Sequence, residues 1–274
     1  MTTTIRRNRL VRLLAAGTVL LLVAGTAARA DVLGQITKTS GQKIVGTIRW
    51  QPVSKQYAIT PRDQQVVLKV APREVADIRV KTPENLERAA QLARAGKYSA
   101  AIPALQNIVD EYTMLQWDVM AGQYLVTAYM KTNDPDSAAR VGNKIVDNNP
   151  RAPYAKEFAP AYWEALVETE QFSRLRKMLD KAAEMGDREL AAIAQVRRGD
   201  MDRKRGDFED ALIDGYLRTA FFFQQIKSVQ PEAIYKAAKC FEELGQHSHA
   251  EKMRKRLLVE FPNDPYTEKV KSGV

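Results

Sequence analysis

Hydrophobic and polar positions follow two different periods in this chain, and the change falls close to residue 82. Between Asp31 and Val80, short apolar runs are separated by polar residues at a period of two, which is typical of strands with one buried face. Beyond Thr82, apolar residues recur at the spacing of an amphipathic helix. One such stripe, at i, i+3, i+4 and i+7, consists of Ile234, Ala237, Ala238 and Phe241.

The first region predicts five short strands. Two β-branched runs surround the turn signal Ser40-Gly41, and three more runs follow at Gln56–Thr60, Val66–Val70 and Val75–Val80. In length and rhythm the segment resembles small SH3-like or Sm-like barrels. A sheet of this size is marginal by itself, so we expect residues 31–81 to form a β module that docks on the first helical hairpin.

The helical region repeats a turn followed by a small residue. In KRGDFEDAL (Lys204–Leu212), Phe208 follows a Gly-Asp turn and Ala211 comes three positions later. The equivalent positions are Ala101, Ala138, Leu175, Ala211 and Ala250, at spacings of 37, 37, 36 and 39 residues. This period predicts a repeat array, in which Ala211 lets two paired helices approach closely and Ala192 lies at a repeat edge.

These positions resemble the tetratricopeptide repeat, a helix–turn–helix unit of about 34 residues. The second, fourth and fifth units carry the pattern best, at Val126, Tyr129, Ala138 and Pro150, at Gly199, Asp202 and Ala211, and at Ala238, Phe241, Ala250 and Pro262. The resemblance covers roughly residues 83–270 and implies a mainly α fold. We expect an α-solenoid of about five helical hairpins over residues 82–270, preceded by the five-stranded, barrel-like module.

The resemblance also implies a binding groove, because the first helix of each unit lines the concave face of such arrays. The family register places these groove positions at Gln123, Thr127, Lys131, Glu164, Glu168, Asp200, Arg203, Lys204, Tyr235 and Lys239. Most are polar or charged, and both signs occur. The resemblance therefore predicts a protein or peptide partner of mixed charge, with a solvated face that binds nothing as the alternative.

An aromatic run offers a second candidate surface. Phe221, Phe222 and Phe223 are consecutive, so a helix of 3.6 residues per turn cannot direct all three into one core. Either the second helix of unit four extends through this run and is held between units four and five, or the run is an exposed patch for a partner.

The first thirty residues have the composition of a secretory leader. Four arginines precede an uncharged run, Leu13–Ala28, and the segment ends in Ala-Arg-Ala. We expect cleavage after Ala30 and a periplasmic or otherwise extracytoplasmic protein, with a retained membrane anchor as the alternative. The whole chain has 42 basic and 33 acidic side chains; without the five arginines of the leader its net charge is +4. This modest charge argues against nucleic-acid binding.

Candidate chemistry is sparse. Phosphate-binding loops and nucleophile motifs do not occur in the sequence, so no catalytic residue, cofactor or metal is predicted. Cys240 is the single cysteine, expected as a buried thiol, and His247 and His249 are expected in an exposed turn. Two functions remain open. One is an exported, non-catalytic scaffold for protein–protein interaction in envelope assembly. The other is a structural, wall-associated component in which the β module grips glycan and the repeats act as a spacer.

Overall fold

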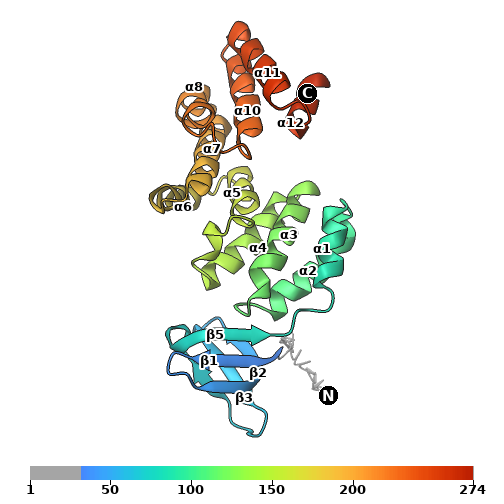
Figure 1. Cartoon of the computed structure of the whole chain (residues 1–274), viewed down its shortest axis with the longest axis vertical. Helices are drawn as coiled ribbons and strands as arrows, with labels where there is room; N and C mark the ends of the chain where they lie inside the picture. Colours follow the sequence, from blue (N-terminus) through green and yellow to red (C-terminus); the bar gives the residue numbers. More distant parts are fainter. Residues whose placement is uncertain (1–31, 274) are drawn as a thin grey trace, which may run out of the picture.

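A computed structural model describes residues 32–273, in which a small sheet is followed by a stack of paired helices along the long axis of the molecule (Figure 1). The predicted leader, residues 1–30, lies outside the described residues. No helix among the described residues is both long enough and apolar enough to cross a membrane.

The sheet contains five antiparallel strands, as predicted. They are β1 (Val32–Lys38), β2 (Lys43–Gln51), β3 (Gln56–Pro61), β4 (Leu68–Val70) and β5 (Val75–Val80), with the single turn η1 (Pro72–Glu74) before β5. Their order is β4-β3-β2-β1-β5, and no pairing of β4 with β5 joins the two edges within residues 32–273. The expected barrel is therefore not closed. Strand β4 has only three residues and offers few ladder hydrogen bonds, and the predicted strand residues Val66 and Val67 are exposed.

Alternation along β2 explains the core of the sheet. Ile44, Gly46, Ile48 and Trp50 point inward, while Val45, Thr47 and Arg49 face outward. Trp50 packs edge-on against Tyr57 of β3, with ring centroids 4.9 Å apart. This apolar face also covers Leu115, a residue of the helical region. The sheet thus completes its small core by using the helices that follow it.

The helical region consists of five hairpins, as expected. The first three are α1 (Leu86–Arg94) with α2 (Tyr98–Glu111), α3 (Trp117–Lys131) with α4 (Pro135–Asn148), and α5 (Ala159–Glu168) with α6 (Phe172–Glu184), and the turn η2 (Ala152–Tyr154) precedes α5. The fourth pairs α7 (Arg188–Arg205) with α8 (Phe208–Asp210), the π-helix η3 (Ala211–Leu217) and α9 (Arg218–Phe222). The fifth pairs α10 (Gln230–Glu243) with α11 (His247–Glu260), and α12 (Pro265–Lys271) closes the stack.

Small residues lie where paired helices come closest. All five repeat positions, from Ala101 to Ala250, are fully buried. In unit four, a Cβ added to Gly215 would lie 2.4 Å from the Cα of Gly199, so α7 and η3 cross with their backbones in contact. Phe208 packs on the cluster that contains Ala211, which explains the aromatic residue after the turn. Ala192 is fully buried in the same cluster, so its assignment to a repeat edge is wrong.

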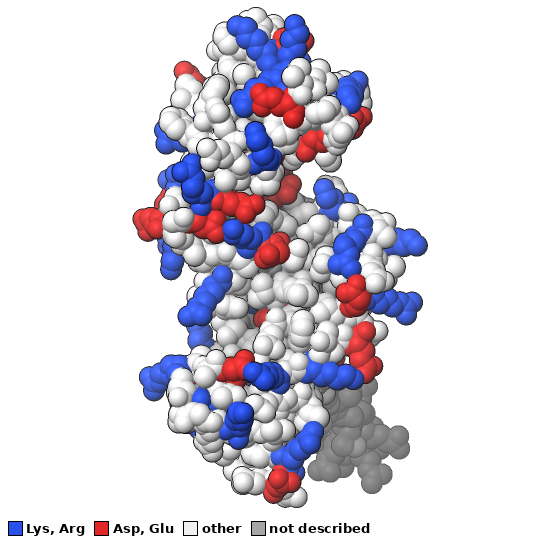
Figure 2. Space-filling model, in the orientation of Figure 1, with Lys and Arg blue, Asp and Glu red and all other residues white. Residues whose placement is uncertain are grey.

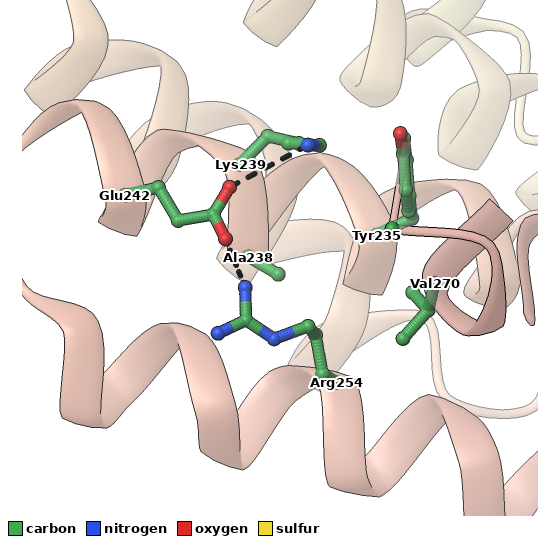
Figure 3. Close-up of a pocket in the computed structure, with 7 residues that line it drawn as sticks. Tyr235, Ala238, Lys239, Glu242, Arg254 and Val270 are labelled. Carbon is green, nitrogen blue, oxygen red and sulfur yellow. Dashed lines mark hydrogen bonds and ion pairs between the residues drawn. The ribbon is translucent and has the colours of Figure 1, made fainter.

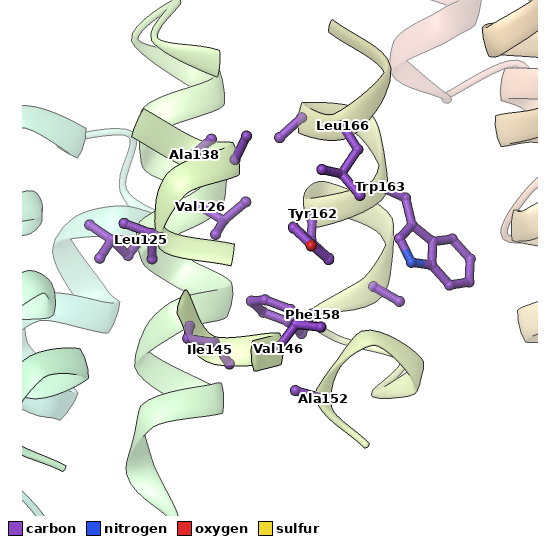
Figure 4. Close-up of a cluster of buried hydrophobic side chains, with 14 of the residues drawn as sticks. Leu125, Val126, Ala138, Ile145, Val146, Ala152, Phe158, Tyr162, Trp163 and Leu166 are labelled. Atoms are coloured by element: carbon purple, nitrogen blue, oxygen red, sulfur yellow. The ribbon is translucent and has the colours of Figure 1, made fainter. Parts of the chain in front are cut away.

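The largest buried side chains join units two and three. Phe158, just before α5, and Tyr162 of α5 project toward α3 and α4, where Leu125 and Ile145 lie, whereas Trp163 points to the opposite side of α5 (Figure 4). Gly142 of α4 leaves room for Tyr162, whose ring would lie 2.1 Å from an added Cβ. Apolar contact fills this junction, and at its edge the Tyr162 hydroxyl donates to Asn143 Oδ1 at 2.7 Å and accepts from Arg174 Nε at 3.0 Å.

The sheet docks on the end of unit one and also on unit two. Trp50 Nε1 donates a hydrogen bond to Asn148 Oδ1 of α4 at 2.7 Å, and the Tyr57 hydroxyl donates to the carbonyl of Met114 at 3.3 Å. Met114 lies in the loop between α2 and α3 with a left-handed φ of 62°. The buried carboxylate of Asp118 accepts a hydrogen bond from the Met114 backbone N–H at 2.8 Å and so fixes this loop. The expected docking on the first hairpin is thus only part of the contact.

Candidate partner-binding groove

Six of the ten predicted groove residues line one cavity. Helices α5, α7, α10 and α12 enclose about 220 Å³, and the predicted lining residues are Glu164, Glu168, Asp200, Arg203, Lys204 and Tyr235. Val167, Lys236, Tyr266 and Lys269 complete the lining. The first helices of units three, four and five therefore line one shared cavity, and its role as a binding groove stays a prediction.

A second cavity, of about 180 Å³, adjoins the first through Tyr235 and holds a seventh predicted residue, Lys239. The carboxylate of Glu242 lies between two cations there, 3.6 Å from Lys239 Nζ and paired on its other oxygen with Arg254 (Figure 3). Arg254 also pairs with Glu251 at 3.1 Å, so two cations and two carboxylates balance here, and Ala238 and Val270 form the apolar side of this cavity.

The three predicted residues of unit two line neither cavity. Gln123, Thr127 and Lys131 lie on α3, where the Thr127 hydroxyl donates to the backbone carbonyl of Gln123 at 2.8 Å and Lys131 is exposed. On the adjoining part of α3, Tyr124 receives a hydrogen bond from Arg94 of α1 at 2.8 Å. The structure therefore separates the unit-two positions from the cavity formed by units three to five.

Asp200 belongs to a buried charge network. Its carboxylate pairs with Arg197 of the same helix and, at 2.7 Å, with Lys236 of α10, and it accepts a hydrogen bond from the Tyr216 hydroxyl at 2.8 Å. Glu232 accepts from Arg197 at 2.8 and 3.3 Å and from Lys236 at 2.6 Å. Two cations and two carboxylates therefore balance at the junction of units four and five.

The electrostatics of this network favour its ionised state. Burial opposes ionisation of Asp200 and Glu232, but the adjacent cations Lys236 and Arg197 outweigh it and lower the pKa of both carboxyl groups. Burial likewise opposes the charge of Arg197, yet the two carboxylates raise its pKa. The pKa of Tyr216 is raised by burial and by Asp200, so its hydroxyl remains a hydrogen-bond donor. This network is a structural element of the groove floor.

Other groove charges are more accessible. Lys204 pairs with Glu168 at 2.7 Å across α7 and α5, with roughly a third to a half of each side chain exposed. Arg203 is exposed and takes part in none of the ion pairs found among residues 32–273. Lys269 of α12 lies over the rings of Tyr235 and Tyr266, 5.6 and 4.8 Å from their centroids. Lys204, Arg203 and Lys269 therefore place cations at the rim of the cavity, and the charge-balanced network around Asp200 forms its floor.

The aromatic run divides into exposed and packed residues. Helix α9 extends through Phe222, which confirms the predicted extension of the second helix of unit four. Phe223 is half-buried against the cluster of units four and five, whereas Phe221 is 52% exposed and Phe222 is 74% exposed. The guanidinium of Arg256 lies 5.7 Å from the Phe221 ring centroid. Only Phe221 and Phe222 form an exposed patch.

The remaining candidate side chains have structural surroundings. Cys240 is buried, as predicted, and burial raises the pKa of its thiol to about 11. His249 stacks on Phe241 with ring centroids 5.3 Å apart, and both His247 and His249 are exposed in the first turn of α11. No cluster of three or more His, Cys, Asp or Glu side chains suited to a metal occurs within residues 32–273.

Sequence reasoning missed Arg197, Tyr216, Glu232 and Lys236. A helical pattern assigns charged residues to the solvent-exposed face of a helix. The partners in this network come from different helices, and Arg197 and Glu232 are 35 positions apart in the sequence. A local signal did exist, since Arg197 and Asp200 are spaced i, i+3 as in many helical ion pairs. That spacing does not distinguish an exposed pair from a buried one.

Comparison with known proteins identifies the repeat type. The tetratricopeptide repeat family model matches residues 232–264, which cover α10, α11 and the turn between them. This chain therefore contains a tetratricopeptide repeat in its fifth unit. No curated protein matches the chain.

Two solved structures are similar in fold. The structure described as MamA AMB-1 P212121 is 19% identical, with a TM-score of 0.44, and the match covers 70% of this chain and 100% of that chain. The structure described as MamA MSR-1 C2 is 20% identical, with a TM-score of 0.43, and the match covers 62% and 94%.

Proposed function

We propose that this protein is an exported, non-catalytic scaffold that binds a segment of a protein partner along the groove of units three to five. The observation that carries the proposal is the cavity shared by α5, α7, α10 and α12, whose rim bears Arg203, Lys204 and Lys269. A tetratricopeptide repeat in the fifth unit supports a protein partner. Mixed charge along the groove favours a segment that carries both acidic and basic side chains.

The compartment is also part of the proposal. Four arginines before an uncharged run and the Ala-Arg-Ala ending support export and cleavage after Ala30. We infer a periplasmic scaffold that serves envelope assembly. Mass-spectrometric detection of a chain beginning at Asp31 in the exported fraction is the expected result, and an intact leader on the exported protein would contradict it.

Site-specific photocrosslinking tests the groove. A photoreactive residue is introduced at Lys204 in the groove, at Phe222 in the aromatic patch, and at Lys177, which is exposed on α6. The proposal expects partner peptides crosslinked at position 204 but not at position 177. Adducts at position 222 alone would assign binding to the aromatic patch instead.

Charge reversal provides the matched functional comparison. Arg203→Glu/Lys204→Glu changes an adjacent Arg–Lys pair in the groove, and Arg176→Glu/Lys177→Glu changes an adjacent, exposed Arg–Lys pair on α6. The groove double variant should lose partner capture in an affinity pull-down of the protein without photoreactive residues, while its melting temperature stays close to that of the control variant. Equal capture of the same crosslink-identified partner by both variants would reject the groove.

The aromatic patch is the second candidate surface, because Phe221 and Phe222 remain largely exposed. Phe221→Ser/Phe222→Ser leaves Phe223 in its cluster and should not alter groove binding. If the protein stays folded but loses its partner, the patch is the binding surface. The wall-associated alternative is tested separately by co-sedimentation with purified peptidoglycan, which the groove variants should not affect.

A further inference from the structure

Charge is distributed very unequally between the two parts of the molecule. Residues 32–81 contain nine Lys or Arg and three Asp or Glu, a net charge of +6. Residues 82–273 contain 28 basic and 29 acidic side chains, a net charge of −1. In Figure 2 the lobe formed by the sheet accordingly shows more blue than red, whereas both colours occur throughout the helical units. The modest charge of the whole chain conceals a strongly basic module.

The cations of the sheet are mostly not neutralised within the protein. Among the ion pairs of residues 32–273, only Arg79 and Lys81 of these nine take part, with Asp77 and Glu84. The other seven have no acidic partner there. Because exposed, unpaired charges of one sign create a local potential, this module attracts polyanions more strongly than the net charge of the chain suggests.

Strand register places four of these cations on one face. Arg49 of β2 is opposite Ala58 of β3, which is opposite Lys69 of β4, so Arg49 and Lys69 share the outward face. Lys43 alternates onto that face along β2, and Arg79 of β5 is opposite Gln35 of β1 on it. We call this the basic face.

Two apolar side chains lie among those cations. Leu33 is 49% exposed and Val45 is 41% exposed; they lie on the outward side of β1 and β2, where Gln35 is opposite Val45. Exposed aliphatic side chains surrounded by Lys and Arg are the combination that binds the boundary between lipid headgroups and acyl chains. An extended nucleic acid would favour aromatic platforms instead, and the outward positions of β1 and β2 contain none.

We propose that the basic face binds the surface of an anionic lipid bilayer. Lys43, Arg49 and Lys69 contact lipid phosphates, while Leu33 and Val45 enter the headgroup layer. The leader is expected to be removed after Ala30, so the basic face itself would have to bind the bilayer in the mature protein. This surface is separate from the groove, and neither proposal depends on the other.

Vesicle binding of the chain from Asp31 onward, which lacks the arginines and the uncharged run of the leader, tests the inference. Co-sedimentation is measured with vesicles that contain about one-third phosphatidylglycerol and with neutral phosphatidylcholine vesicles. Lys43→Glu/Arg49→Glu/Lys69→Glu is compared with Lys97→Glu/Lys177→Glu/Lys252→Glu, three exposed helical lysines outside the described ion pairs that give the same change in net charge. The basic-face variant should lose about a hundredfold in affinity for the anionic vesicles, and the control variant should lose much less.

Two further measurements keep the test decisive. Lys43→Gln/Arg49→Gln/Lys69→Gln should lose an intermediate amount of vesicle affinity, and this variant controls for misfolding of the charge-reversed one. Raising the salt concentration should weaken binding of the wild-type protein to anionic vesicles. The proposal would be overturned if the basic-face and control variants lost the same affinity for anionic vesicles. It would also be overturned if the protein bound neutral vesicles and the basic-face variants did not reduce that binding. Direct binding to double-stranded DNA that is tighter than binding to anionic vesicles at matched phosphate concentration, and that is lost in the basic-face variant, would also overturn it in favour of a nucleic-acid surface.

Discussion

The junction between units two and three and the junction between units four and five solve the same packing problem with different chemistry. The first is filled by large apolar side chains from α5, with Tyr162 seated over Gly142. The second joins α7 of unit four to α10 of unit five through four largely buried charges; inside unit four, next to Asp200 in the chain, the backbones of Gly199 and Gly215 meet. Apolar burial stabilises without direction, whereas a buried ion network is favourable only in one geometry. The polar contacts of the first junction include the partly exposed pair of Arg174 and Asp147, whereas the charges of the second are largely buried, so the second constrains the relative position of the groove helices more strongly.

The π-helix belongs to this second solution. Over Ala211–Leu217 the backbone hydrogen bonds of the π-helix span five residues instead of four; within this segment Gly215 lies against Gly199, and the Tyr216 hydroxyl donates to Asp200. The side-chain amide of Gln195 donates to the carbonyl of Asp214, a π-helical carbonyl. Helices α7 and η3 are thus joined by the backbone contact of Gly199 with Gly215 and by the hydrogen bond from Gln195 to Asp214.

The largest effect should follow from removing one buried charge. Arg197→Met leaves the carboxylates of Asp200 and Glu232 with Lys236 as their remaining cation, and breaking a buried pair in this way costs about 3–5 kcal/mol. Arg197→Met/Glu232→Leu removes a cation and a carboxylate together and leaves Asp200 paired with Lys236. Urea denaturation should show that the double variant recovers most of the lost stability; a double variant as unstable as the single one would contradict the network.

The second effect tests the close approach of the helices. Ala211→Trp inserts a large ring into a fully buried position beside η3, and overpacking costs about 1–3 kcal/mol or more. Ala100→Trp, at an exposed position of α2, is the matched control. Ala192→Trp should be as harmful as Ala211→Trp, because both alanines are fully buried in one cluster. Equal melting temperatures for the Ala211 and Ala100 variants would argue against the helix pairing described here.

The sequence predicted the hairpins well and the groove floor poorly, for a physical reason. The fully buried residues Ala101, Ala138 and Ala250 are small because two backbones meet there, and that requirement appears in the sequence at a regular interval. A buried ion network has no such period. Its members Arg197 and Glu232 are identified only when the helices are in place, and so is the exposure of Phe222 at the end of α9. The open sheet was missed because β4 is shorter than its apolar run.

Acid should distinguish the buried network from the docking site of the sheet. The pKa values of Asp200 and Glu232 are lowered in the folded protein, so their stabilisation is complete above the ordinary carboxyl values of 3.8 and 4.5 and is lost as pH falls below them. Burial raises the pKa of Asp118, so the effect of this group on stability has the opposite dependence on pH. Ionisation of Asp118 costs stability as pH rises. Acid therefore does not weaken the docking of the sheet through this group.

Hydrogen exchange measured at pH 5 and pH 3 provides the test of this contrast. Protection of amides in α7 and α10 should fall in acid by more than protection in β2 and β3, after correction for intrinsic exchange rates. Arg197→Met/Glu232→Leu, which carries one carboxylate fewer in the network, should reduce the difference. A uniform loss of protection across both parts would show that the network does not determine the acid response.

The smallest effect concerns the residue next to Arg197. Arg198 pairs with Asp180 of α6 at 2.8 Å, but 36% of the Arg198 side chain and 57% of the Asp180 side chain are exposed. Exposed pairs are screened by water and salt and contribute about 0–1 kcal/mol. Arg198→Met should therefore change the free energy of unfolding far less than Arg197→Met, and its small effect should vanish at high salt, whereas the Arg197→Met effect should persist because its partners are buried. If both variants lost similar stability in the same urea titration, burial would not distinguish the network from the surface pairs. The contrast drawn between the two junctions would then be wrong as well.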